Sequence, residues 1–114
     1  MQYMVLIYGD ESAWENATVE EKEAGYGSHR RFAEAVAELG GQIINGAELE
    51  PTAMATTIRG DLIMDGPFLD AREVLGGFYI VEARDLDHML TMARHCPAHS
   101  GGIEVRPIVD HSAA

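Results

Sequence analysis

The 114-residue sequence predicts a single-domain α+β fold, and three observations support this class. Short runs rich in β-branched and aromatic residues alternate with two longer stretches of helical periodicity. The chain is long enough for one hydrophobic core but too short for two, so we expect one domain over residues 1–114. Hydrophobic residues make up 46% and charged residues 24% of the chain, which is the balance of a folded globular protein.

The N-terminal part of the chain predicts a strand followed by a helix. Residues 3–8 form a short apolar run that is typical of a strand. Ser or Thr precedes Glu by three residues at Ser12–Glu15 and again at Thr18–Glu21, which is the spacing of a capping box. We expect the helix to begin after Thr18 and to run to about Leu39, where Gly40-Gly41 can supply the left-handed residue that commonly closes a helix.

Two glycines interrupt the first half of this helix. Gly25 and Gly27 each cost about 1 kcal/mol relative to Ala, so the first turns are expected to bend, fray or separate from a second segment near Ser28. The second half is better defined, with charged residues on the opposite side of an apolar stripe. The stripe consists of Phe32, Val36 and Leu39, with Ala33 and Ala37 beside it.

The middle of the chain predicts a strand and then a β-hairpin. Residues 42–45 form the strand, and Gly46 ends it. Two further runs, residues 54–59 and 62–65, are separated only by Gly60-Asp61, which is a two-residue hairpin signal.

The last third predicts a strand, a helix and a final strand. Residues 78–83 form the strand, Asp85 is placed to cap the helix, and Pro97 stops it. The apolar face of this helix is expected to consist of Leu86, Met89, Leu90, Ala93 and Cys96. Residues 103–109 form the final strand, in which Pro107 belongs at a sheet edge or near a strand end because it lacks an N–H.

This order of elements corresponds to two βαβ units with a hairpin between them. It predicts a ferredoxin-like, split βαβ sheet with an inserted β-hairpin and both helices on one face. The strands at 3–8 and 78–83 carry apolar side chains on both faces, so the second face of the sheet also needs a cover. Because no third helix is available, we expect a second copy to provide that cover in a homodimer.

Charge and composition exclude several classes of partner. Eight Lys and Arg against 19 Asp and Glu give a formal net charge of -11, which argues against nucleic acid and anionic membranes as partners. One cysteine, no secretory signal pattern and no apolar run of about 20 residues lead us to expect a cytoplasmic location. The sequence lacks dinucleotide, phosphate-loop and nucleophile-elbow motifs, and we expect no cofactor.

Four motifs carry a resemblance to a known family. They are the start Tyr3–Glu11 (YMVLIYGDE), the tetrapeptide Asp65–Phe68 (DGPF), the run Glu73–Tyr79 (EVLGGFY) and Glu104–Pro107 (EVRP). With these motifs in order along nearly the whole chain, the sequence resembles the YCII-related family and, within it, the DGPF subgroup.

The resemblance implies a ferredoxin-like dimeric α/β barrel. It also implies a helical histidine that works with an acidic partner in a cleft between sheets, and the matching position in this sequence is His29. One relative is a dehydrochlorinase that acts on a chlorinated hydroxyquinol. Family members also occur beside or fused to extracytoplasmic-function sigma factors, which implies a possible sigma factor association.

The residues around His29 support two interpretations. His29 precedes Phe32 by three residues and Val36 by seven, so on a helix it shares their stripe and points toward the sheet. An imidazole there can act as a general acid or base because its ordinary pKa lies near neutrality. The structural alternative is a hydrogen-bonded histidine at the rim of the core.

Asp65 and Glu73 are the candidate carboxylate partners of this histidine, with Asp65 first because it ends a strand beside a turn. In the structural alternative, the tetrapeptide is only a turn. Asp65 then accepts turn amides, Gly66 supplies an unusual backbone angle and Phe68 fills the core.

Three further residues are candidate ligand contacts. Tyr8 and Tyr79 can line a pocket with their phenol groups, although interface packing is the commoner role. Arg106 can bind an anion, although an ion pair with Glu104 on the same strand face is the simpler expectation. The cluster formed by His88, His95, Cys96 and His99 contains metal-ligand residue types, but its spacing does not bring four ligands together, and we expect no metal site.

Two functions follow from these features. The first is a small cofactor-independent enzyme in which His29 and a carboxylate perform acid–base, lyase-type chemistry on a small polar or aromatic molecule in a dimer cleft. The alternative is a non-catalytic module that binds a small ligand or docks on a partner such as a transcription factor.

Overall fold

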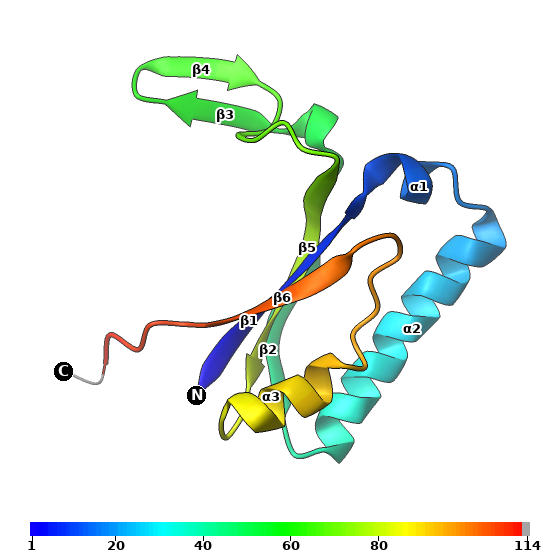
Figure 1. Ribbon diagram of the computed structural model, residues 1–114, viewed down its shortest axis with the longest axis vertical. Helices are drawn as coiled ribbons and strands as arrows, with labels where there is room; N and C mark the ends of the chain where they lie inside the picture. The colour runs from blue at the N-terminus through cyan, green and yellow to red at the C-terminus, as the bar shows by residue number, and fades with distance from the viewer. Residues whose placement is uncertain (113–114) are drawn as a thin grey trace.

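A computed structural model describes residues 1–112 of the chain (Figure 1). Its elements in order are β1 (Gln2–Asp10), α1 (Glu11–Glu15), α2 (Val19–Glu38), β2 (Gln42–Glu48), the 3-10 helix η1 (Thr52–Met54), β3 (Thr56–Arg59), β4 (Leu62–Asp65), β5 (Glu73–Glu82), α3 (Leu86–Ala93) and β6 (Gly102–Pro107). The α+β class is confirmed. Residues 113 and 114 of the single domain predicted over 1–114 lie outside the described residues.

Four of the strands form one sheet, in the order β2-β5-β1-β6, with every neighbouring pair antiparallel. This arrangement is consistent with a ferredoxin-like fold. β3 and β4 form a separate two-stranded sheet. Figure 1 shows α2 and α3 on one side of the four-stranded sheet and the β3–β4 hairpin projecting on the other. We call the face packed against the helices the covered face, the opposite one the open face, and residues 52–69 the arm.

The N-caps agree with the sequence at two of three positions. Asp85 caps α3 as expected, because its Oδ1 accepts a hydrogen bond of 2.8 Å from the N–H of His88. Thr18 and Glu21 form the expected capping box, with hydrogen bonds of 3.1 and 3.4 Å to each other's backbone N–H groups. The box expected at Ser12–Glu15 is wrong. Asp10 caps α1 instead, because its carboxylate accepts hydrogen bonds from both the N–H and the hydroxyl of Ser12.

α2 is a single helix of 20 residues, so the expected separation near Ser28 does not occur. Gly25 has a packing role, because a Cβ at this position would lie 3.1 Å from the ring of Trp14. Gly40 follows the helix with a φ of +83°, which is the left-handed conformation expected of a closing residue.

The strand ends differ most from the sequence expectation. β2 continues to Glu48 instead of ending at Gly46, through a register shift between Ile43 and Asn45. β5 begins at Glu73 instead of at residue 78. β6 ends at Pro107, because proline has no backbone N–H to donate a hydrogen bond to a neighbouring strand. These extensions position residues of the candidate site.

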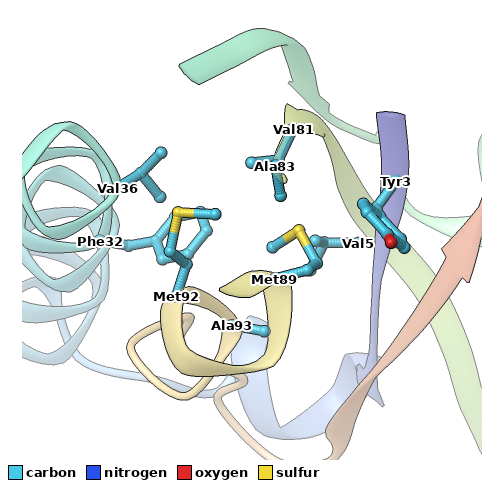
Figure 2. Packing of buried hydrophobic residues seen from close by; sticks show 9 residues of the cluster. All are labelled: Tyr3, Val5, Phe32, Val36, Val81, Ala83, Met89, Met92 and Ala93. Atoms are coloured by element: carbon cyan, nitrogen blue, oxygen red, sulfur yellow. The ribbon is translucent and has the colours of Figure 1, made fainter. Parts of the chain in front are cut away.

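The core lies between the covered face and the helices α2 and α3 (Figure 2). Its fully buried members come from β1, α2, β5, α3 and the loop after β5: they are Tyr3, Val5, Phe32, Val36, Val81, Ala83, Met89, Met92 and Ala93. The predicted face of α3 is partly wrong, because Leu86 and Leu90 are exposed and His88 and Met92 are buried. α3 also ends at Ala93, before Cys96.

The open face is apolar, and no other element of residues 1–112 covers it (Figure 1). Met4 and Leu6 of β1 lie opposite Ile80 and Phe78 of β5 in the register, and all four side chains are only partly buried. The molecule is 17 Å thick along its shortest axis, enough for two layers. A single copy therefore leaves one side of its central sheet toward solvent.

Candidate functional site

The sheet register places Tyr79 on the covered face, beneath α2. Tyr79 lies opposite Val5, a core residue of that face. Its ring packs against Phe32 with a centroid distance of 4.9 Å, and its hydroxyl lies 2.7 Å from Nδ1 of His29. His29 precedes Phe32 by one helical turn, so the same stripe of α2 supplies both contacts. The prediction that His29 points toward the sheet is confirmed.

Burial favours the neutral forms of both rings. It lowers the pKa of His29 below 6.5, while the negative charge of Glu48 acts in the opposite direction with a smaller effect. Burial also raises the pKa of Tyr79 above 10.0, with a smaller contribution from the charge of Cys96. At neutral pH the pair is therefore an imidazole and a phenol, and either group can donate the proton of their shared hydrogen bond.

The second nitrogen of His29 is left for other partners. Among residues 1–112, Nε2 of His29 has no hydrogen-bond partner. The side chain is only partly buried, and the described residues contain no buried side-chain nitrogen or oxygen that lacks a partner, so Nε2 is open to solvent. Tyr79 thus fixes one side of the ring while the other side can exchange a proton.

Glu48 is the carboxylate whose negative charge acts on His29. It ends β2, and its Oε1 accepts a hydrogen bond of 3.1 Å from the hydroxyl of Tyr26. Tyr26 lies one turn before His29 on α2, so the two hydrogen-bonded pairs are neighbours on one helix. Burial and then Glu48 raise the pKa of Tyr26, which keeps this phenol protonated.

A glycine makes room for the Tyr79 ring. Gly46 lies opposite Tyr79 in the β2–β5 register, and a Cβ at Gly46 would lie 2.7 Å from Cδ1 of that ring. Any larger residue at this position would therefore displace the phenol from its place beside His29.

An aromatic cluster borders the site on the side of α1. The ring of Trp14 makes edge-to-face contacts with Tyr26 at 5.6 Å and with His99 at 5.3 Å. The ammonium group of Lys22 lies 5.9 Å from the Trp14 ring centroid, within the range of a cation–π contact. These contacts connect α1 and the loop before β6 to the start of α2.

The structure does not bring the two predicted carboxylate partners to His29 within one subunit. Asp65 ends β4 in the arm, which projects on the side of the sheet opposite the helices (Figure 1). Glu73 begins β5, six residues before Tyr79, which corresponds to roughly 20 Å along a strand. Sequence reasoning missed Tyr26 and Glu48 as neighbours of His29.

Two of the predicted ligand contacts lie on the other face of the sheet. Tyr8 follows Leu6 at the next position but one along β1, and it pairs with Gly102 of β6. Arg106 lies opposite Met4 and forms the expected ion pair with Glu104, at 3.5 Å. The sheet therefore separates both residues from His29 and Tyr79.

The tetrapeptide Asp65–Phe68 forms a turn at the base of the hairpin. Gly66 has a φ of +102°, its N–H donates to the carbonyl of Ala55, and its carbonyl accepts from the hydroxyl of Thr57. The unusual backbone angle expected at Gly66 is confirmed. The expectation that Phe68 fills the core is wrong, because this residue is 58% exposed and lies under the guanidinium of Arg59 at 3.8 Å.

His88 has a structural role. Its Nδ1 accepts a hydrogen bond from the N–H of Arg84, and its Nε2 donates to the carbonyl of Leu39 at 2.6 Å. The ring thereby joins the end of α2 to the start of α3. Cys96 is partly buried, and burial raises the pKa of its thiol to about 12, so the thiolate is disfavoured. Residues 1–112 contain no group of three or more His, Cys, Asp or Glu arranged to hold a metal ion.

These features define a class: a small α+β protein with an imidazole–phenol pair on the helix-covered face of an antiparallel sheet. The chain belongs to the YCII-related domain family, which matches residues 1–112. An uncharacterized protein of Rhizobium meliloti (strain 1021) is 35% identical over 119 residues, which cover 95% of this chain and 92% of that relative. No helix among the described residues is long and apolar enough to cross a membrane.

Proposed function

We propose that this protein is an acid–base catalyst in which His29 exchanges a proton with a small polar or aromatic molecule. The observation that carries the proposal is the 2.7 Å hydrogen bond between His29 Nδ1 and the Tyr79 hydroxyl, in a pair whose second imidazole nitrogen has no partner among the described residues. An imidazole held on one side and accessible on the other is suited to proton transfer.

The two neutral tautomers of His29 support opposite steps. When Nδ1–H donates to the Tyr79 oxygen, Nε2 carries a lone pair and acts as the base. When the Tyr79 hydroxyl donates to Nδ1, Nε2 carries the proton and acts as a donor. In an elimination, Nε2 takes a proton from the substrate, the electron pair left behind forms the new double bond, and the leaving group departs with the electron pair of its own bond. Burial lowers the pKa of His29, and the negative charge of Glu48 acts in the opposite direction with a smaller effect, so Glu48 favours the imidazolium that forms.

The proposal places the protein in the DGPF subgroup and makes it a homodimer. The turn built by Asp65–Phe68 supports the subgroup. The partly exposed side chains of Met4, Leu6, Phe78 and Ile80 support a dimer in which the open faces of two copies pack together as a dimeric α/β barrel. Asp65 and Glu73 belong to the proposed active site only if the second copy brings them there.

A chlorinated hydroxyquinol is the probe that tests this function, with chloride release as the measured product. We expect wild-type protein to release chloride, His29→Gln to lose at least about 100-fold of the rate, and Tyr79→Phe to lose less. His95→Gln changes an exposed histidine outside the site and serves as the matched control.

The proton-transfer role is wrong if folded His29→Gln releases chloride at the wild-type rate. It is also wrong if the wild-type protein releases none and the NMR signals of His29 do not respond to the hydroxyquinol. A response of the His29 signals without turnover would favour the ligand-binding alternative.

A further inference from the structure

Exposed apolar side chains are concentrated on the arm. Of the 17 large hydrophobic residues that are exposed among residues 1–112, seven lie within residues 52–69. They are Met54, Ile58, Leu62, Ile63, Met64, Phe68 and Leu69. Soluble monomers rarely expose so many apolar side chains together, so such a concentration indicates an interaction surface.

The two faces of the hairpin differ in how they are covered. Alternation along the strands places Thr57, Arg59, Leu62 and Met64 on one face, where Thr57 is buried and the Arg59 guanidinium lies over the Phe68 ring. The other face carries the cross-strand pair of Ile58 and Ile63, which are 67% and 74% exposed. Leu62 and Met64 on the first face are also exposed, at 64% and 38%, so Ile58 and Ile63 form the most exposed apolar cross-strand pair of the hairpin. We therefore take the Ile58–Ile63 face as the contact surface of the arm.

The hairpin needs packing against a further element on this face. An isolated two-stranded sheet is marginally stable in water and needs packing against another element. Within residues 1–112, Thr57 is the one buried residue of the two hairpin strands, and the other seven are exposed. A partner that comes and goes would leave the hairpin unsupported for part of the time, whereas a second copy of the same chain is always available.

The shape of the molecule agrees with a second copy. In Figure 1 the arm and the segment after β6 both project on the open-face side of the sheet, at opposite ends. A copy seated on the open face thus lies beneath the arm. Two-fold symmetry then covers the arm and the open face of both copies at once.

We propose that the arm is a clasp: the Ile58–Ile63 face of each copy packs against the second copy that is seated on the open face. This inference rests on the homodimer of the proposed function and extends it to a contact outside the sheet. The acid–base chemistry of His29 does not depend on it.

Sedimentation equilibrium of a double variant tests the clasp. Ile58→Thr/Ile63→Thr keeps β-branched residues in the hairpin and removes apolar surface. We expect the dimer dissociation constant to rise at least about tenfold. Val19→Thr/Leu86→Thr is the matched control, because both residues are exposed apolar positions on helices, and its constant should stay within about twofold of the wild type.

Hydrogen exchange on the wild type gives a second measurement that needs no variant. Amides of residues 56–65 should exchange more slowly at a concentration at which sedimentation equilibrium finds the dimer than at a lower concentration at which it finds the monomer. The clasp is wrong if the arm amides exchange equally at both concentrations, which would leave the Ile58–Ile63 face free for a different protein. It is also wrong if the arm variant dimerises as tightly as the wild type.

An open-face variant separates the clasp from the dimer itself. If Phe78→Glu dissociates the dimer and the arm variant does not, the face-to-face dimer is supported and the clasp is wrong. If the wild-type protein is monomeric at about 100 µM, both the dimer and the clasp are wrong. The chloride-release assay measures the proposed activity of His29, and its outcome does not depend on the results for the dimer or the clasp.

Discussion

The protonation of His29 reflects a competition between burial and a nearby charge. Burial at the rim of the core disfavours the imidazolium, and the carboxylate of Glu48 favours it. Burial has the larger effect, so the ring is mainly neutral at neutral pH. A neutral imidazole hydrogen-bonded to a phenol is able to accept a proton, whereas an imidazolium is not.

The lowered pKa of His29 predicts a pH dependence of stability. Between the folded pKa and the ordinary value of 6.5, the unfolded chain binds more protons than the folded one. The contribution of His29 to the free energy of unfolding is therefore complete above pH 6.5 and falls as the pH is lowered toward the folded pKa. His29→Gln should remove this component.

Urea denaturation of both proteins between about pH 5 and pH 8 measures the effect. The wild type should lose more unfolding free energy than His29→Gln as the pH falls below 6.5. The other histidines cancel in this comparison. A wild type that instead gains stability over the variant toward acid pH would show that the attraction of Glu48 exceeds the cost of burial.

At the scale of elements, the pairing of β2 with β5 builds the site. The register shift in β2 lets the strand continue to Glu48, which brings this carboxylate to Tyr26 of α2. Gly46 on β2 leaves the space that the ring of Tyr79 occupies on β5. The site therefore depends on one small residue in an edge strand.

Gly46→Ala should displace the Tyr79 ring and destabilise the fold by about 1 to 3 kcal/mol, since the added methyl group overlaps the ring. Thermal or urea denaturation measures the loss, and the NMR signals of His29 report whether its hydrogen bond is broken. Gly102→Ala is the control, because a Cβ at this strand position meets nothing within 4 Å. Equal effects of the two substitutions would contradict a specific role for Gly46.

Local patterns in the sequence predicted the elements well where the pattern itself determines the structure. The capping box of Thr18 and the closing Gly40 have local physical causes, and both were found. A local pattern does not show which of several nearby side chains will form the hydrogen bond to a given backbone group. Ser12 matched a cap pattern, but the preceding Asp10 caps α1. His88 turned inward on α3 because backbone groups far apart in sequence need its two nitrogens.

The site was only partly predictable for the same reason. His29 was found because its stripe on α2 is a local pattern. Glu48 was missed because the strand was expected to end at Gly46, and a bulge is not visible in a short apolar run. Tyr26 had a usable signal, since it lies three residues before His29 on the same helix.

At the scale of the whole molecule, the net charge and the exposed apolar surface have opposite effects on dimerisation. Each copy carries a formal net charge of -11, so two copies repel, while the open face and the arm favour association. Raising the salt from about 20 mM to about 300 mM screens the repulsion and leaves apolar burial in place. The dimer dissociation constant should therefore fall at high salt, as measured by sedimentation equilibrium. A dimer that weakens with salt would instead be held by ion pairs.

The single tryptophan provides an optical reporter at a useful place. Trp14 touches Tyr26, which is bound to Glu48 and lies one turn from His29. Its emission is sensitive to the position of the neighbouring rings and to local polarity. A molecule that binds beside the imidazole and moves Tyr26 will alter that fluorescence. Compounds can therefore be screened for binding by the intrinsic fluorescence of Trp14, without a label.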